Sequence, residues 1–414
     1  MPNLSLCPSV RALQNTPLAT NRKSLRHHVN RCADFLKFIP LYFMMFNTNG
    51  QTVSSLWNEY VSNPYNHPNI PNNSYAGYGT GTTPIPAPSI TPINVTASPY
   101  KAVPNDNIND QPAIQAAVNA AGAAGGGIVY LPAGTYRLDK PLYIKYSNVI
   151  VRGQGSTGST TTILDFKFSM YSMYKADIDA SGNKSCLWWS TGLVWMGPTD
   201  AFKSNGAPNL AGGSFEDWKY NSTLATVAKL SNPGSFSITV DNAASLSPGM
   251  KVVLCYRMPT DKSFIKHVYG HAATTPGIDN DSYVGNCADI RSPVTPNYYL
   301  PALIKSISGN TITFDRPLRI KVDPALWTTT VRDIKSIVRE SGLENVQIKG
   351  YNTSKMAHLA TPTSTTTAGA PTLGGWNGIY IDQSWNCWVN NVRFVNLECG
   401  VIFACAKNCS VLNT

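Results

Sequence analysis

The chain has 414 residues, and its 33 Lys and Arg outnumber its 23 Asp and Glu, so the formal net charge is +10. Only 14% of the residues are charged, against about 25% in an average globular domain, and 43% are hydrophobic. This composition excludes a disordered chain, a coiled coil and a collagen. An excess of positive charge is typical of nucleic-acid binders. Half of this excess, a net +5, lies in residues 1–50, and the other half is spread over the much longer remainder of the chain. We therefore expect no nucleic-acid partner.

The N-terminal segment has the order of a secretory signal peptide. Basic residues 22–31 precede an apolar run, Phe35–Phe46, and a small polar stretch, Asn47–Thr52. The apolar run has about 12 residues, too few to cross a bilayer, and no longer run follows it. We therefore expect residues 1–51 to be a signal or leader segment. The protein would then be secreted, periplasmic or bound at the cell surface, without a membrane span.

After the leader, the sequence predicts an extended arm, then one helix, and then many short strands. Residues 52–104 are rich in Pro, Asn and Tyr, which predicts an extended arm without helices. Asp110 can cap a helix that opens with Gln111-Pro112 and ends at Gly122, since its apolar residues recur at helical spacing. Strand-like stretches follow at 128–138, 141–146 and 148–155, separated by Gly and Pro.

Residues 105–165 resemble a known family. The sequence GGG-x-V-Y-x-P-x-G-T-Y after a short helix is similar to the opening of the pectate-lyase-superfamily proteins, which are right-handed parallel β-helices. The resemblance implies an all-β, right-handed, single-stranded parallel β-helix over residues 105–414, with a short helical cap at its N-terminal end. It is a signature of architecture and identifies no active site.

An internal repeat supports this fold independently. Residues 377–392 align with 399–414 at an offset of 22, which superposes Asn386-Cys387 on Asn408-Cys409. Residues 345–348 align with 391–394 at an offset of 46, which is one coil plus a loop at about 353–375. We expect the paired Asn and Cys residues to stack between neighbouring coils inside the solenoid.

A long insertion separates the two matching parts of the solenoid. It spans about residues 166–335, and its segments 234–257 and 302–320 predict short antiparallel strands with turns at Pro248-Gly249 and Gly309-Asn310. The repeat is still in progress at Thr414, so we expect that coils of a longer β-helix are missing. Gly153-x-Gly155-x-x-Gly158 matches a dinucleotide fingerprint, but β-rich residues follow where that motif needs a helix.

The resemblance implies action on a polysaccharide, by one of two chemistries. A hydrolase needs two carboxylates. We compared the last coils with the pattern of catalytic residues in polygalacturonase-like hydrolases. Asn377 stands where that pattern has its first Asp, and Glu398 is a single acid where the pattern has two. Arg319-Ile320-Lys321 matches the R-I-K motif of the pattern, but it lies upstream in the insertion and not after the last coils. Asp382 and Glu398 remain candidate acids.

A lyase needs a base and a means of neutralising a uronate carboxylate, either Ca²⁺ or cationic side chains. The candidate base and acid group comprises Lys266, His267, Tyr269 and His271 in the insertion. Asp279 and Asp281 follow and could bind Ca²⁺. No Cys-x2-Cys pair is present, so we expect no structural zinc.

Candidate substrate-binding residues are Trp376, Trp385 and Arg339, because sugar rings stack on aromatic faces and acidic sugars pair with arginine. We therefore expect an exported polysaccharide-active protein, and first a lyase that cleaves an acidic glycan by β-elimination. The alternatives are a glycoside hydrolase on a similar fold, a non-catalytic glycan-binding or adhesive solenoid, and a tailspike-like solenoid, of which only the last would trimerise.

Overall fold

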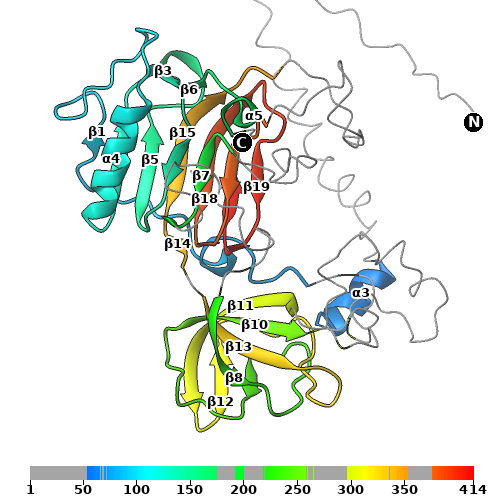
Figure 1. Ribbon diagram of the computed structural model, residues 1–414. Helices are drawn as coiled ribbons and strands as arrows, with labels where there is room; N and C mark the ends of the chain where they lie inside the picture. Colours follow the sequence, from blue (N-terminus) through cyan, green and yellow to red (C-terminus); the bar gives the residue numbers. More distant parts are fainter. Residues whose placement is uncertain are drawn as a thin grey trace, which may run out of the picture. The chain divides into compact units, whose positions relative to one another are not determined.

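The computed structural model describes residues 54–65, 67, 70, 72–174, 192–199, 218, 220–257, 259, 264, 296–334, 336–352 and 375–414 (Figure 1). The chain divides into two units, Met1–Asn63 and Pro64–Thr414, and each is described by itself. The leader expected at residues 1–51 lies outside the described residues and stays a prediction. Within the described ranges, no helix is both long and apolar enough to span a membrane.

The described part of the first unit is a helix, α3 (Ser55–Ser62). The Ser54 hydroxyl caps it by accepting a hydrogen bond from the Trp57 N–H at 3.2 Å. The prediction of an arm without helices is therefore wrong at this point. The reason is local, since no proline interrupts the chain from Ser54 to Asn63.

In the second unit, α4 (Gln111–Ala123) is the predicted cap helix, and it buries Ile114 and Val118 against the strands. Asp110 occupies the N-cap position, but its side chain makes no capping hydrogen bond. Its Oδ1 instead accepts the Val103 N–H at 2.8 Å, so this carboxylate fixes the end of the arm to the helix start. Short helices η1 (Tyr78–Gly81), η2 (Gly158–Thr160) and α5 (Met170–Tyr174) complete the described helices of this unit.

The strands around α4 form the predicted parallel β-helix (Figure 1). Every pair among them is parallel. The largest sheet contains β1 (Ile93–Asn94), β2 (Gly127–Leu131), β5 (Val149–Gly153), β15 (Gly342–Lys349), β18 (Trp388–Val395) and β21 (Ser410–Leu412), with β3 (Gly134–Leu138) and β6 (Thr162–Phe166) off this path. A second sheet contains β19 (Val401–Phe403), β16 (Ile379–Ile381), β7 (Val194–Met196) and β4 (Leu142–Ile144), and a third contains β14 (Val338–Arg339), β17 (Ser384–Trp385) and β20 (Ala406–Lys407).

The register of these sheets confirms both sequence repeats. Val346 pairs with Val392 at the offset of 46, and Trp388 pairs with Ser410 at the offset of 22. β7 lies inside the segment that the sequence assigned to the insertion, so that segment also contributes one strand to the solenoid. The glycines of the G-x-G-x-x-G motif lead through the single turn η2 into β6 and open no long helix, as expected.

Asparagines form the corners of the coils. Asn345, Asn386, Asn391 and Asn408 all have φ between 53° and 55°, a left-handed conformation that asparagine tolerates better than other residues with a Cβ. The Asn391 Nδ2 also donates to the Asn345 Oδ1 at 2.8 Å, which links one coil to the next. These asparagines turn the chain at the corners, and the pair Asn345 and Asn391 also holds neighbouring coils in register.

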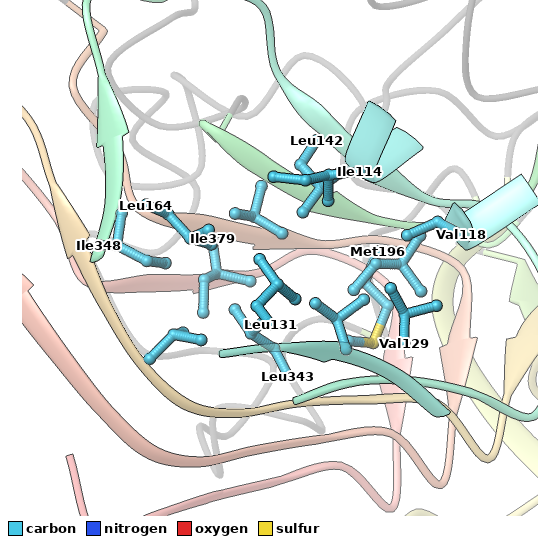
Figure 2. Packing of buried hydrophobic residues seen from close by; sticks show 14 of the residues in the cluster. Ile114, Val118, Val129, Leu131, Leu142, Leu164, Met196, Leu343, Ile348 and Ile379 are labelled. Carbon is cyan, nitrogen blue, oxygen red and sulfur yellow. The ribbon is translucent and has the colours of Figure 1, made fainter. Parts of the chain in front are cut away.

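The interior of the solenoid is apolar, and Cys387 lies fully buried in it next to Cys409, as the repeat predicted. Burial raises the pKa of the Cys387 thiol well above its usual range, which suits an inert core residue. Figure 2 shows the same core from close by, with residues of the cap helix and of strands β2, β4, β6, β7, β15 and β16 pointing toward one another: Ile114, Val118, Val129, Leu131, Leu142, Leu164, Met196, Leu343, Ile348 and Ile379.

A six-stranded antiparallel sheet follows β7 along the chain and forms what we call the β subdomain. Its order is β8 (Tyr220–Thr226), β13 (Thr329–Ile334), β10 (Lys251–Arg257), β11 (Pro296–Ser308), β12 (Thr311–Phe314) and β9 (Ser237–Thr239). The β11–β12 hairpin turns at Gly309-Asn310, as predicted. Leu254, Tyr256 and Trp327 belong to a core that is separate from that of the solenoid.

Candidate functional site

A cleft of about 820 Å³ lies where the β subdomain meets the coil that carries β19 and β20. Three parts of the chain line it: described residues of the arm between Pro64 and Gly77, residues of the β subdomain from β11 and the segment after β12, and residues of the coil between Phe403 and Cys409. Trp218, Val253 and Cys255 of the β subdomain pack with Cys405 of the coil in one small buried cluster, and Trp218 also lines the cleft. These apolar contacts fix two walls of the cleft relative to each other.

The arm is held in place at both sides of the cleft. The Arg319 Nη2 donates to the Ser74 carbonyl on the β-subdomain side, and the Tyr75 ring meets the Phe236 ring edge-on at 5.8 Å. On the solenoid side, the Tyr78 N–H donates to the Ser410 Oγ at 2.8 Å. The aromatic side chains that line the cleft are Tyr65, Tyr75, Trp218, Tyr298, Tyr299 and Phe403.

One lysine, Lys407, is among the described residues that line the cleft, and its side chain is only 1% exposed. Its Nζ donates to the Asp315 Oδ2 at 3.0 Å and lies 4.6 Å from the centre of the Trp385 ring. Burial lowers the pKa of this amine to about 8, because the charged form loses hydration that Asp315 restores only in part. Arg316 and Arg319 lower the same pKa further by repulsion.

Two arginines extend the positive charge of the cleft. The Arg316 Nε and the Arg319 Nη1 are buried, and neither has a hydrogen-bond partner among the described residues. Burial and the neighbouring Arg319 both lower the pKa of Arg316. Both arginines line the cleft, so their positive charge favours an anionic ligand there.

Carboxylates are missing from the same surface. Among the described residues that line the cleft there are two arginines and one lysine, and no Asp or Glu. Asp315 lies behind Lys407 and is held by it. The cleft therefore suits an acidic ligand with an apolar face, since cations would bind the acid and tyrosine rings would contact the face.

Several predicted site residues cannot be placed in this arrangement. Lys266, His267, Tyr269, His271, Asp279 and Asp281 lie outside the described residues. Their proposed roles as base, acid and calcium ligands stay predictions.

Two other candidates are buried away from the cleft surface. Asp382 is 2% exposed, and its backbone N–H donates to the Met196 carbonyl at 2.9 Å inside the solenoid wall. Trp385 is 3% exposed, and the amines of Lys407 and Lys251 lie 4.6 Å and 5.7 Å from its ring centre. Burial of this extent argues against direct contact of either side chain with a polysaccharide. Trp385 instead supports Lys407.

Glu398 and Trp376 lie together, but elsewhere on the solenoid. The Glu398 Oε2 accepts the Trp376 N–H at 3.1 Å, and the Trp376 ring meets the Tyr351 ring edge-on at 6.3 Å. Glu398 thus ties one coil to the next. Arg339 is exposed on β14, and neither it nor this pair is among the residues that line the cleft.

Two cleft residues that the sequence analysis did not select, Arg319 and Lys407, carry weak signals in the sequence. Arg319 belongs to the Arg319-Ile320-Lys321 stretch, which lies far upstream of the last coils in the sequence. The fold of the β subdomain brings Arg319 to the cleft beside Lys407. Lys407 also occupies the strand position that Trp385 holds one coil earlier, and a lysine at a buried position of a repeat is itself unusual.

The described residues do not form a calcium site. In the described ranges, no group of three or more His, Cys, Asp and Glu side chains is arranged to hold a metal ion. The cleft presents cations, whereas Ca²⁺ takes six to eight oxygen ligands, commonly with several carboxylates. The cleft residues therefore do not fit Ca²⁺.

Comparisons with known proteins agree with the fold. Residues 93–203 match the family model "Rhamnogalacturonase A/epimerase, pectate lyase-like". Two mannuronan C5-epimerases of Azotobacter vinelandii, AlgE1 and AlgE3, are 53% identical over 47 residues and 57% identical over 42 residues. Those matches cover 11% and 10% of this chain but only 3% and 2% of the two epimerases.

Among solved structures, the tailspike gp49 of Pseudomonas phage LKA1 is 14% identical, with a TM-score of 0.32, over 72% of this chain and 39% of that chain. The Gp54 tailspike of Acinetobacter baumannii bacteriophage AP22, solved with a capsular saccharide, is 10% identical, with a TM-score of 0.31, over 77% of this chain and 46% of that chain. This chain thus spans less than half of either tailspike. Residues 93–203 are thus similar to a pectate lyase-like family, and the parallel sheets of the chain form a parallel β-helix.

Proposed function

We propose that this protein is an exported polysaccharide lyase that binds an acidic glycan in the cleft and cleaves it by β-elimination. The observation that carries the proposal is the composition of the cleft, whose described lining residues include two arginines and a lysine and no acidic residue. The leader-like N-terminal segment is consistent with export, and acidic polysaccharides are substrates found outside the cytoplasm.

The chemistry of elimination matches such a cleft. A uronate resists loss of its C5 proton because the resulting carbanion lies next to a carboxylate that is already negative. Arg316 and Arg319 would pair with that carboxylate and so stabilise the charge that develops on it. Tyr298 and Tyr299 would contact the sugar ring beside it.

Hydrolysis is less well supported by the same surface. Glycoside hydrolases place two carboxyl groups about 5–9.5 Å apart across the scissile bond. The described cleft lining offers none, and the nearby Asp315 is engaged by Lys407. A binding protein without activity would need the same cations, so an assay of turnover decides between binding and catalysis.

The test uses the full chain with polygalacturonate, alginate and a sulfated algal glycan, and dextran as an uncharged control. Ultraviolet absorbance reports the unsaturated uronate, and reducing ends report every cleavage. We expect both signals to rise together on at least one carboxylated polymer and neither on dextran. Reducing ends without absorbance would refute the lyase and support a hydrolase.

Two further measurements on the same samples distinguish a lyase from an epimerase and from a protein that only binds glycan. Proton abstraction at C5 also begins an epimerisation, the activity named for the two Azotobacter proteins, and ¹H NMR of the polymer detects it. Binding to polygalacturonate without cleavage or epimerisation would indicate a glycan-binding solenoid. Replacement of the exposed Lys305 of β11 by Gln is the matched control for charge, because this residue lies outside the cleft and should leave every signal unchanged.

A further inference from the structure

The outer face of the solenoid carries a group of charged side chains across strands β3, β6 and β15 (Figure 1). In β6 and β15, Leu164 and Ile348 belong to the buried core. Because side chains alternate along a strand, the next residues, Asp165 and Lys349, point outward, and they lie in register with Arg137 of β3. This row of three residues is not part of the cleft lining.

Asp165 is the centre of this group, and its side chain is only 6% exposed. Its Oδ2 lies 2.6 Å from the Lys167 Nζ, which also donates to the Tyr351 hydroxyl. Its Oδ1 accepts the Tyr351 hydroxyl at 2.8 Å and lies 3.8 Å from the Lys349 Nζ. One buried carboxylate therefore holds two ammonium groups and one phenol in place.

The two lysines remain open to solvent, unlike the buried Lys407 of the cleft. The side chains of Lys167 and Lys349 are 31% and 34% exposed, and Tyr351 is 37% exposed. The two amines lie 4.5 Å and 5.0 Å from the centre of the Tyr351 ring, and the Trp376 ring meets that ring edge-on at 6.3 Å. A ligand in solution can therefore reach both cations and an aromatic ring that its neighbours hold in position.

Positive charge is in excess on this face. Two ammonium groups share the one carboxylate of Asp165. Arg393 of β18 is exposed and lies in register with Gln347, which is two residues before Lys349 and so shares its face. Neighbouring like charges repel each other, so an anion that pairs with these cations lowers the electrostatic energy of the face.

We propose that Lys167, Lys349, Tyr351 and Arg393, which we call the lysine face, form a second binding surface for an acidic polysaccharide, separate from the cleft. The choice of ligand rests on the proposed function. The cations would pair with carboxylates of successive sugars, and the Tyr351 ring would contact the apolar face of a sugar beside them. Neighbouring strands lie about 4.8 Å apart, so the side chains form an extended row that suits a polymer better than a small anion.

Electrophoresis in native gels that contain polygalacturonate or alginate measures this binding on ice and without any need for turnover. The first variant combines Lys167→Gln with Arg393→Gln, which leaves Lys349 and the Tyr351 hydroxyl to hold Asp165. We expect its apparent Kd for the polymer to rise about 5- to 30-fold, the effect of losing two exposed charged contacts. Thermal melting confirms that the variant is folded.

A second variant should change binding in the opposite direction. Asp165→Asn keeps the size of the side chain but removes the negative charge that Lys167 and Lys349 share, so the apparent Kd should fall by about 2- to 5-fold. A group of charges that served only to stabilise the fold would lose stability in this variant and gain no affinity. Lys305→Gln, in the β subdomain and outside both surfaces, is the matched control and should bind as the wild type does.

The outcomes separate the lysine face from the cleft. If the folded double variant binds both polymers as tightly as the wild type while Arg316→Met binds them more weakly, the cleft stands and the lysine face is not a glycan site. The same conclusion follows if folded Asp165→Asn gains no affinity. If the double variant loses affinity while Arg316→Met does not and no unsaturated product forms, the lysine face is supported and the lyase function fails. A wild type that neither polymer retards would overturn this inference.

Discussion

Replacing Arg316 with methionine should weaken glycan binding without destabilising the protein. The buried Arg316 Nε has no hydrogen-bond partner in the described structure, and an unsatisfied buried donor costs about 1–3 kcal/mol. Methionine removes that donor and the charge, and its flexible side chain can replace the packing of the arginine stem. The free energy of unfolding should therefore stay the same or rise, by up to about 1–3 kcal/mol.

The same substitution should cost affinity. A hydrogen bond between charged groups contributes about 1.5–3 kcal/mol, so the Kd for an oligogalacturonate should rise about 10- to 150-fold. Urea denaturation measures the stability of Arg316→Met, and isothermal titration calorimetry measures its affinity, with Lys305→Met as the control. A variant that is destabilised by more than about 2 kcal/mol while binding with unchanged affinity would show that Arg316 holds the fold together and does not receive an anion.

Two predictions concern stability elsewhere in the solenoid. Glu344→Gln should lower the free energy of unfolding by about 1–3 kcal/mol, because the carboxylate accepts the Arg152 Nε at 2.7 Å and the Trp388 Nε1 at 2.6 Å, and loss of its charge leaves the arginine without a counterion. Asp139→Asn, at a more exposed ion pair, should change stability by less than about 1 kcal/mol in the same urea titration. Burial raises the pKa of Asp110 to about 6, so the folded state holds a proton that the unfolded state releases, and stability should fall as pH rises from about 4 to 6. Asp110→Asn should flatten that dependence, and an unchanged slope in denaturation at several pH values would contradict the assignment.

The solenoid could be predicted from the sequence because its determinants are local and repeated. The cap helix follows from apolar spacing between Gln111 and Ala123, and each coil repeats the asparagine that turns its corner. The offset of 22 between Cys387 and Cys409 is a geometric constraint, since one turn of the solenoid must return the chain to the strand below. Such patterns can be seen without knowledge of distant contacts.

The cleft could not be predicted in the same way. Lys407 and Asp315 are 92 residues apart, and only the packing of the β subdomain on a coil brings them together. Helix α3 was missed because the composition of the whole arm masked a short proline-free stretch with a serine cap. Trp385 was expected to face the substrate because aromatic residues often do, whereas its position in the repeat places it in a buried wall.

Mass spectrometry of the products tests the central claim most directly. The full chain is incubated with oligogalacturonates and with oligomers of alginate, and the masses of the fragments are compared with those from acid hydrolysis. Elimination predicts that one fragment of each cleavage is lighter by one water than its hydrolytic counterpart, and that Arg316→Met gives much less of it. Fragments that all carry the added water, or intact oligomers throughout, would contradict the account.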